Sequence, residues 1–196
     1  MRRFFVILTL SSFFFACGQY EAPKPRGYFR IALPEKEYQV FDAGFPYRFQ
    51  YPAYAEFVPD SRSWAEPYWA DVVFDSFSAR LHLSYKPVAD QENLYKYLDD
   101  AHTFVHKHIP KATAIHDEQF MMEESRVFGM LFRIRGREAA SPLQFYATDS
   151  TDHFLRGALY FETTPNNDSL APVIDFINRD IWHLLSTLEW QQSSGN

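Results

Sequence analysis

Cys17 is the residue whose position in the sequence suggests the most specific chemistry. It is the only cysteine among 196 residues, and it follows a stretch with two arginines, a long apolar run and the small Ala16. These are the parts of a cleaved secretory signal. The apolar run covers residues 4–15, whereas a helix that crosses a bilayer core needs about 20 residues. We therefore expect residues 1–16 to be a cleaved signal peptide, which leaves 180 residues of the 196.

Residues 14–17 resemble a bacterial lipobox, in which the cysteine sulfur receives acyl chains such as palmitate. Phe14 stands where leucine is usual, so an ordinary signal peptide that happens to contain a cysteine is the alternative. The lack of a second cysteine favours lipid, because a secreted protein with one free thiol is unusual. Two or more acyl chains would give stable membrane attachment. The sequence thus predicts lipidation at Cys17 and a domain tethered by residues 17–27.

Ser150, Asp152 and His153 supply the residue types of a hydrolase. No Gly-x-Ser-x-Gly motif accompanies them, and residues so close in sequence rarely place nucleophile, base and orienting group in line. We interpret residues 149–151 as a turn whose side chains bond their own backbone. The sequence therefore predicts no catalytic residues, with an envelope hydrolase as the weaker alternative.

His102 and His106 are four residues apart in a predicted helix, a spacing that can hold a metal ion. His108 and His116 follow, but no Cys-x-x-Cys or His-Glu-x-x-His framework is present. We interpret the pair as part of a solvated helix face and expect neither a metal nor another cofactor.

Arg156 and Gly157 lie inside a predicted strand. Glycine weakens a strand interior unless the strand bends or another group approaches closely there. A charged neighbour indicates a solvated face or a contact. We predict a protein-docking role for these two residues.

Two kinds of periodicity define the elements that would position these side chains. Alternation of apolar and polar residues predicts strands, and an apolar stripe at helical spacing predicts helices. The predicted strands cover 45–52, 79–86, 113–122, 127–135, 143–148 and 154–162, and the predicted helices cover 90–109 and 168–188.

Two further features concern the first part of the chain. Pro46 and Pro52 flank the first predicted strand, and because proline cannot donate to a sheet ladder, they favour an edge position. Residues 54–69 contain prolines and tryptophans without periodicity. We expect a loop there that lays aromatic side chains over the core as a packed lid, or alternatively binds a partner.

The order of elements predicts an α+β fold, a mainly antiparallel sheet packed by two main helices, in a single globular domain over 28–196. The order resembles the Mog1/PsbP-like fold, which also occurs in the DcrB lipoprotein family. That resemblance implies a fold and no residue-specific function.

The charge balance argues against nucleic acid as a partner. Without Arg2 and Arg3, 17 of the 19 basic residues remain against 25 acidic ones, a net charge of −8. Nucleic-acid binding depends on basic side chains that neutralise phosphates. Aromatic residues make up 18% of the chain and suit either a core or a protein-binding surface.

Several segments resemble one lipoprotein family. They are PRGYFRI at 25–31, LPEK at 33–36, LSYK at 83–86 and above all TDSTDHFLRGALYF at 148–161. Together they are similar to the gliding motility lipoprotein GldD of the Bacteroidetes, from the lipobox to about residue 190.

The resemblance implies a lipid-anchored protein of the cell envelope that is required for gliding. Its implied partners are other gliding motility lipoproteins and components of the type IX secretion system, and it implies no catalytic residues. Gly18 follows the cysteine, which by analogy with lipoprotein sorting favours the outer membrane, facing the periplasm, over the inner membrane. An envelope module that binds a lipid or glycan is the alternative function.

Overall fold

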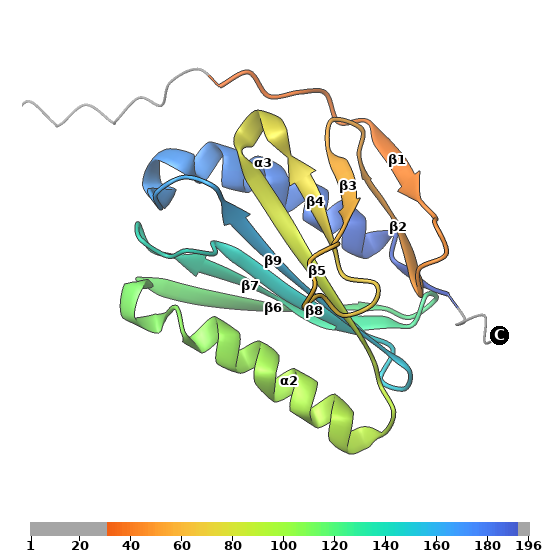
Figure 1. The fold of residues 1–196 in the computed structure, drawn as a ribbon. Coiled ribbons are helices and arrows are strands. Elements are labelled where there is room, and N and C mark those ends of the chain that lie inside the picture. Colours follow the sequence, from red (N-terminus) through yellow and green to blue (C-terminus); the bar gives the residue numbers. More distant parts are fainter. Residues whose placement is uncertain (1–30, 192–196) are drawn as a thin grey trace, which may run out of the picture. The chain divides into compact units, whose positions relative to one another are not determined.

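The computed structural model describes residues 31–191. Cys17, the predicted signal peptide 1–16 and the tether 17–27 lie outside the described residues. From Leu33 onward the chain forms one compact unit (Figure 1).

The unit consists mainly of β-strands, with two α-helices. The elements in chain order are β1 (Tyr38–Phe41), β2 (Tyr47–Pro52), β3 (Glu56–Pro59), β4 (Ala70–Phe74), η2 (Asp75–Phe77), β5 (Ala79–Pro87), α2 (Gln91–His106), η3 (Ile109–Lys111), β6 (Ala114–Met122), β7 (Val127–Arg135), β8 (Leu143–Thr148), β9 (His153–Phe161), α3 (Asn167–Ser186) and β10 (Glu189–Trp190).

The strands form two antiparallel sheets. The larger has seven strands in the order β3-β4-β5-β9-β8-β7-β6, and the smaller has three in the order β1-β2-β10. The predicted meander is confirmed, because β6, β7, β8 and β9 pair in chain order. β5 then pairs along its whole length with β9. The predicted α+β class is therefore confirmed.

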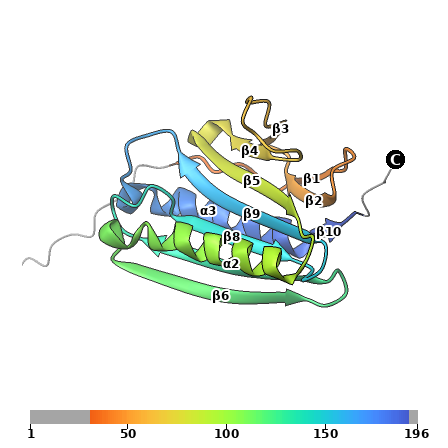
Figure 2. The same ribbon diagram turned by 60° about the horizontal axis from the view of Figure 1, so that its bottom comes forward.

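The two helices pack on opposite faces of the larger sheet (Figure 2). On β9, Leu155 and Leu159 belong to the core that contains the apolar stripe of α3, whereas Phe154 belongs to the core beneath α2. Neighbouring strand residues point to opposite faces, so this division places one helix on each side. β8 lies between both helices and is buried at every position.

The smaller sheet corrects one expectation. β2 is the central strand and not an edge, since β1 pairs on one side and β10 on the other. The prolines do not interfere, because Pro46 precedes the strand and contributes its carbonyl as acceptor to Gln191 N at 2.9 Å. Pro52 is the last strand residue. The predicted aromatic face is confirmed by Tyr47 and Phe49, which are fully buried.

The predicted loop over 54–69 is partly wrong. Residues Glu56–Pro59 form β3, which pairs with the unpredicted β4. Both strands are short, so neither shows an alternation long enough to predict a strand from. The remainder, 60–69, connects the two strands and carries Trp64 and Trp69, whose rings lie 6.2 Å apart.

The predicted helices differ slightly at their ends. Asp90 caps α2 by accepting a bond from Asn93 N at 2.8 Å, but the helix ends at His106, three residues before the expected end. Ile109 consequently lies outside the apolar stripe and is 57% exposed. The C-terminal helix begins at Asn167, one residue before the predicted start.

A buried carboxylate fastens the segment before β1 to α3. Asp180 is 1% exposed and accepts hydrogen bonds from the hydroxyls of Tyr38 and Tyr54. Lys36 Nζ lies 2.5 Å from an Asp180 oxygen and donates to the Phe176 carbonyl at 3.0 Å. Burial and the bond to Asp180 raise the pKa of Tyr38 to about 12. We call this group the Lys36–Asp180 clamp.

Candidate functional site

Polar and charged side chains line the part of the larger sheet that lies beside α2 and is not covered by it. Along β5, Leu81, Leu83 and Tyr85 point into the core with α3, so the residues between them face the other side. Figure 2 shows β4 and β5 beyond the edge of α2 on that side. We call this surface the β5–β9 face; its residues are Asp71, Arg80, His82, Ser84, Lys86, Arg156 and Tyr160.

A hollow of about 310 Å³ lies where the β5–β9 face meets α2. Aromatic side chains from α2, β9 and the loop before β4 form its walls, and charged groups from β5 and β9 reach into it. We call it the Arg156 hollow; it is lined by Trp69, Ser84, Lys86, Tyr97, Asp100, Ala101, Phe104, Phe154 and Arg156.

Gln144 and Phe104 hold the Arg156 side chain in this hollow. Its Nη2 donates to Gln144 Oε1 at 2.7 Å, and its guanidinium lies 4.4 Å from the centre of the Phe104 ring. Gln144 is 2% exposed and donates from Nε2 to His108 Nε2 at 2.9 Å. The imidazole nitrogen must then be an acceptor, which requires neutral His108. Burial and the nearby Arg156 charge lower the pKa of His108, consistent with that form.

Arg156 differs from the other basic residues of this surface in having no acidic partner. Within residues 31–191, no carboxylate oxygen lies within 4.0 Å of its guanidinium nitrogens. Lys86, in contrast, binds both oxygens of Glu66, at 2.7 and 2.9 Å. Burial lowers the pKa of the Arg156 guanidinium, because removing a charge from water disfavours the charged form.

Gly157, the second predicted docking residue, lies on the opposite side of the strand and is buried. A Cβ atom at this position would lie 2.1 Å from Cε1 of Phe145, the residue paired with it on β8. Its small size is therefore needed for packing against the ring. Of the two predicted residues, Arg156 alone reaches the surface.

A second hollow, of about 410 Å³, lies farther along the β5–β9 face. Asp71 accepts bonds from Arg80 Nη1 at 3.0 Å and from His82 Nδ1, and Arg80 also donates to Glu162 at 3.1 Å. Sequence reasoning missed this group because β4, which carries Asp71, was not predicted. Its charges satisfy one another, so the group serves as a polar network on the strand surface.

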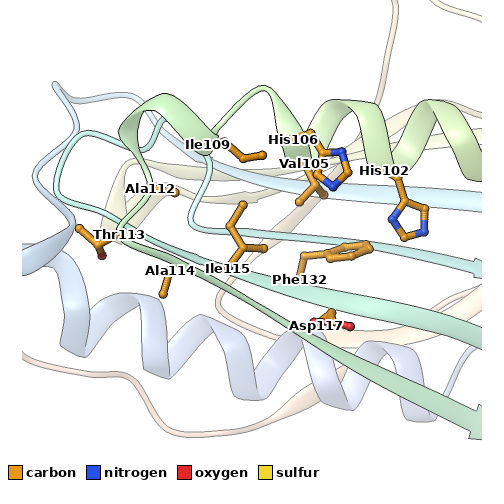
Figure 3. Close-up of a pocket in the computed structure, with 10 residues that line it drawn as sticks. All are labelled: His102, Val105, His106, Ile109, Ala112, Thr113, Ala114, Ile115, Asp117 and Phe132. Carbon is orange, nitrogen blue, oxygen red and sulfur yellow. The ribbon is translucent and has the colours of Figure 1, made fainter.

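The predicted histidine pair lies on the other side of α2, at a hollow of about 510 Å³ shown in Figure 3. The His102 and His106 rings are 6.4 Å apart. His106 is exposed as expected, but the His102 ring packs 5.3 Å from Phe132 and 5.9 Å from Tyr146, so the helix face is only partly solvated. Across residues 31–191, no three His, Cys, Asp or Glu side chains group as metal ligands.

The residues of the hydrolase alternative form a turn. Asp149 Oδ1 accepts from the backbone N–H groups of Thr151, Asp152 and His153 at 2.9 to 3.0 Å, which confirms the predicted turn. His153 Nδ1 is bonded to the Tyr85 hydroxyl at 2.8 Å. No hydrogen bond in the described part of the chain joins Ser150 to His153, and the three residues do not assemble a triad.

These features define an α+β protein with a seven-stranded antiparallel sheet, a helix on each face and an aromatic-walled hollow around an arginine. The fold is similar to the solution structure of cyanobacterial PsbP (CyanoP) from Synechocystis sp. PCC 6803, at 12% identity and a TM-score of 0.48 over 81% of this chain and 95% of that one. The order of elements predicted from the sequence resembles the Mog1/PsbP-like fold, which is named after PsbP.

A sequence model of one protein family matches most of the chain. The model described as gliding motility lipoprotein GldD matches residues 18–190, and the chain belongs to that family. Membership places it among lipoproteins involved in gliding motility. No match was found among curated proteins. No helix within residues 31–191 has both the length and the apolar character for crossing a membrane.

Proposed function

We propose that this protein is anchored in the cell envelope by acyl chains on Cys17 and contributes to gliding by binding another protein through the β5–β9 face. The partner belongs to the gliding machinery, as one of its other lipoproteins or as a component of the type IX secretion system. The protein works by contact and carries out no catalysis. Gly18 after the cysteine favours the outer membrane, with the domain facing the periplasm.

One observation carries this proposal: the Arg156 hollow presents a half-buried arginine with aromatic walls and with no acidic partner within residues 31–191. Arginine and aromatic side chains are the residues enriched where proteins bind one another. Gln144 and Phe104 hold the guanidinium in place before a partner arrives, so little side-chain freedom remains to be lost on binding.

Replacing Arg156 by glutamine in the full chain tests the proposal. In a gliding host that lacks its own copy, the wild-type gene should restore colony spreading and Arg156→Gln should not. Glutamine keeps a polar side chain and removes the charge. Thermal unfolding of the purified variant checks that the fold is retained.

Arg133→Gln is the matched control. Arg133 is also a strand arginine, its side chain is 37% exposed, and it pairs with Glu118 at 2.6 Å. On β7 it lies two residues from Leu131, which faces the core with α3, so it points away from the β5–β9 face. This variant should spread normally. Full spreading of Arg156→Gln at wild-type protein levels would contradict the proposal.

A further inference from the structure

We propose that the Arg156 hollow receives an acidic side chain, Asp or Glu, of the partner protein. The carboxylate lies against the Arg156 guanidinium, and the residues beside it in the partner chain pack on the aromatic walls. This inference rests on the proposed docking function and specifies the chemistry of the partner at that site.

The first argument is the unequal pairing of charges on this surface. Arg80, Lys86 and Arg62 each have an acidic partner within 3.1 Å, and these partners are Asp71, Glu162, Glu66 and Asp60. Arg156 has a neutral partner, Gln144. Within residues 31–191, Arg156 is half-buried and has no carboxylate partner, so its charge is available to an external anion.

The second argument is the geometry of the free donors. A guanidinium carries five N–H donors in a fixed plane. Gln144 accepts from one nitrogen, Nη2, and the Tyr160 hydroxyl is a second neutral neighbour of the group. The remaining donors match the two oxygens of a carboxylate, which arginine binds in a bidentate arrangement. The ring of Phe104 covers one side of the group and reduces competition from water.

The third argument concerns the charge of the ligand that the residues lining the hollow favour. Tyr97, Phe104 and Trp69 could surround a cation as well as an apolar group, but Arg156 and Lys86 both line the hollow and would repel a cation. Asp100 also lines the hollow; it is exposed on α2 and forms no ion pair within residues 31–191. Its charge opposes an incoming anion, so removing Asp100 and removing Arg156 should have opposite effects.

The test uses the full-length lipoprotein in gliding cells, with a photoreactive phenylalanine derivative in place of Tyr97. This residue lines the hollow. Tyr95 is the matched control position, because it lies on the same helix, is 66% exposed and does not line the hollow. We expect position 97 to cross-link to one protein, and the cross-linked peptide identified by mass spectrometry to contain Asp or Glu.

Charge variants then test the chemistry of the contact. Arg156→Gln should reduce the cross-link about tenfold or more, as expected when one member of a hydrogen-bonded charge pair is lost. Asp100→Asn should increase it. Replacing the partner's acidic residue by lysine should abolish the cross-link, and Arg156→Glu in this protein should restore it.

Three outcomes of cross-linking without a charge variant would overturn the inference. They are equal cross-linking at 95 and 97, a cross-linked peptide without an acidic residue, and attachment of position 97 to a lipid or glycan. A weaker cross-link with Asp100→Asn would also overturn it, since that result indicates a cationic ligand. The proposed docking function fails separately, through normal spreading of Arg156→Gln, so the two failures are distinguishable.

Discussion

Arg156, Gln144 and His108 form a chain of hydrogen bonds. The amide oxygen of Gln144 accepts from Arg156, which leaves the amide nitrogen to donate to a neutral His108. The sequence singled out Arg156 because a charge stood beside a glycine in a predicted strand. It could not indicate Gln144 and His108 as its supports, because their contacts depend on strand register and on where α2 ends. The polar Gln144 inside the apolar segment 143–148 was the one available signal.

The neutral state of His108 predicts acid sensitivity. Burial lowers its pKa from the ordinary 6.5, and the pKa values of His153 and His183 are lowered in the same direction. As the pH falls through about 6.5, the unfolded chain therefore takes up protons first, and the free energy of unfolding decreases. Each such group contributes at most about 1.4 kcal/mol per pH unit.

Urea unfolding between pH 7.5 and pH 5 measures this effect. His108→Gln removes one of the three histidines with a lowered pKa and should reduce the dependence on pH in that interval, while His153 and His183 keep their contributions. His106→Gln is the control for the loss of a histidine side chain, because His106 is exposed on α2. An unchanged slope in His108→Gln would contradict the assignment of His108 as the neutral acceptor of the Gln144 hydrogen bond.

At the scale of elements, the long strands follow from alternation and the short ones do not. The predicted strands 79–86, 127–135 and 143–148 agree with β5, β7 and β8 to within one residue. β1, β3, β4 and β10 have two to five residues each, which is too few for a periodic signal. Their positions depend on pairing with strands distant in sequence. For that reason Asp71 on β4 was the one residue of the β5–β9 face that lay outside the predicted strands.

Two glycines in the sheet face aromatic rings on the neighbouring strand. Gly157 pairs with Phe145, and Gly129 pairs with Phe120, whose Cζ would lie 2.4 Å from an added Cβ. Each ring fills the space that a side chain on the next strand would occupy. The pairing of β6 with β7 and of β8 with β9 thus depends on the same combination of a large and an absent side chain.

Gly157→Ala should therefore destabilise the protein by about 1–3 kcal/mol, the usual cost of overpacking a core. Chemical denaturation of the purified variant measures it. In a Phe145→Leu background, Gly157→Ala should cost less stability than in the wild type, because the smaller leucine side chain leaves room for the added methyl group. If Gly157→Ala costs the same in both backgrounds, the contact with Phe145 is not the cause.

At the scale of the whole molecule, the proposed function needs both an anchor and a docking surface. Cys17→Ala should leave the unit from Leu33 onward folded but release it from the membrane, since acyl attachment is lost. Cell fractionation measures the release, and colony spreading should fail. Arg156→Gln should instead remain in the membrane fraction. Full spreading by unlipidated Cys17→Ala protein would show that anchoring is dispensable.

The Lys36–Asp180 clamp has a mechanical consequence. If the chain is anchored at Cys17 and a partner holds the sheet, tension between them enters the unit from its N-terminal side. Lys36 and Tyr38 pass that load to Asp180, which lies within a 20-residue helix, before the four residue pairs of β1 and β2 bear it. Lys36→Met should lower the force of the first rupture in single-molecule pulling, because β1 would then peel without the clamp.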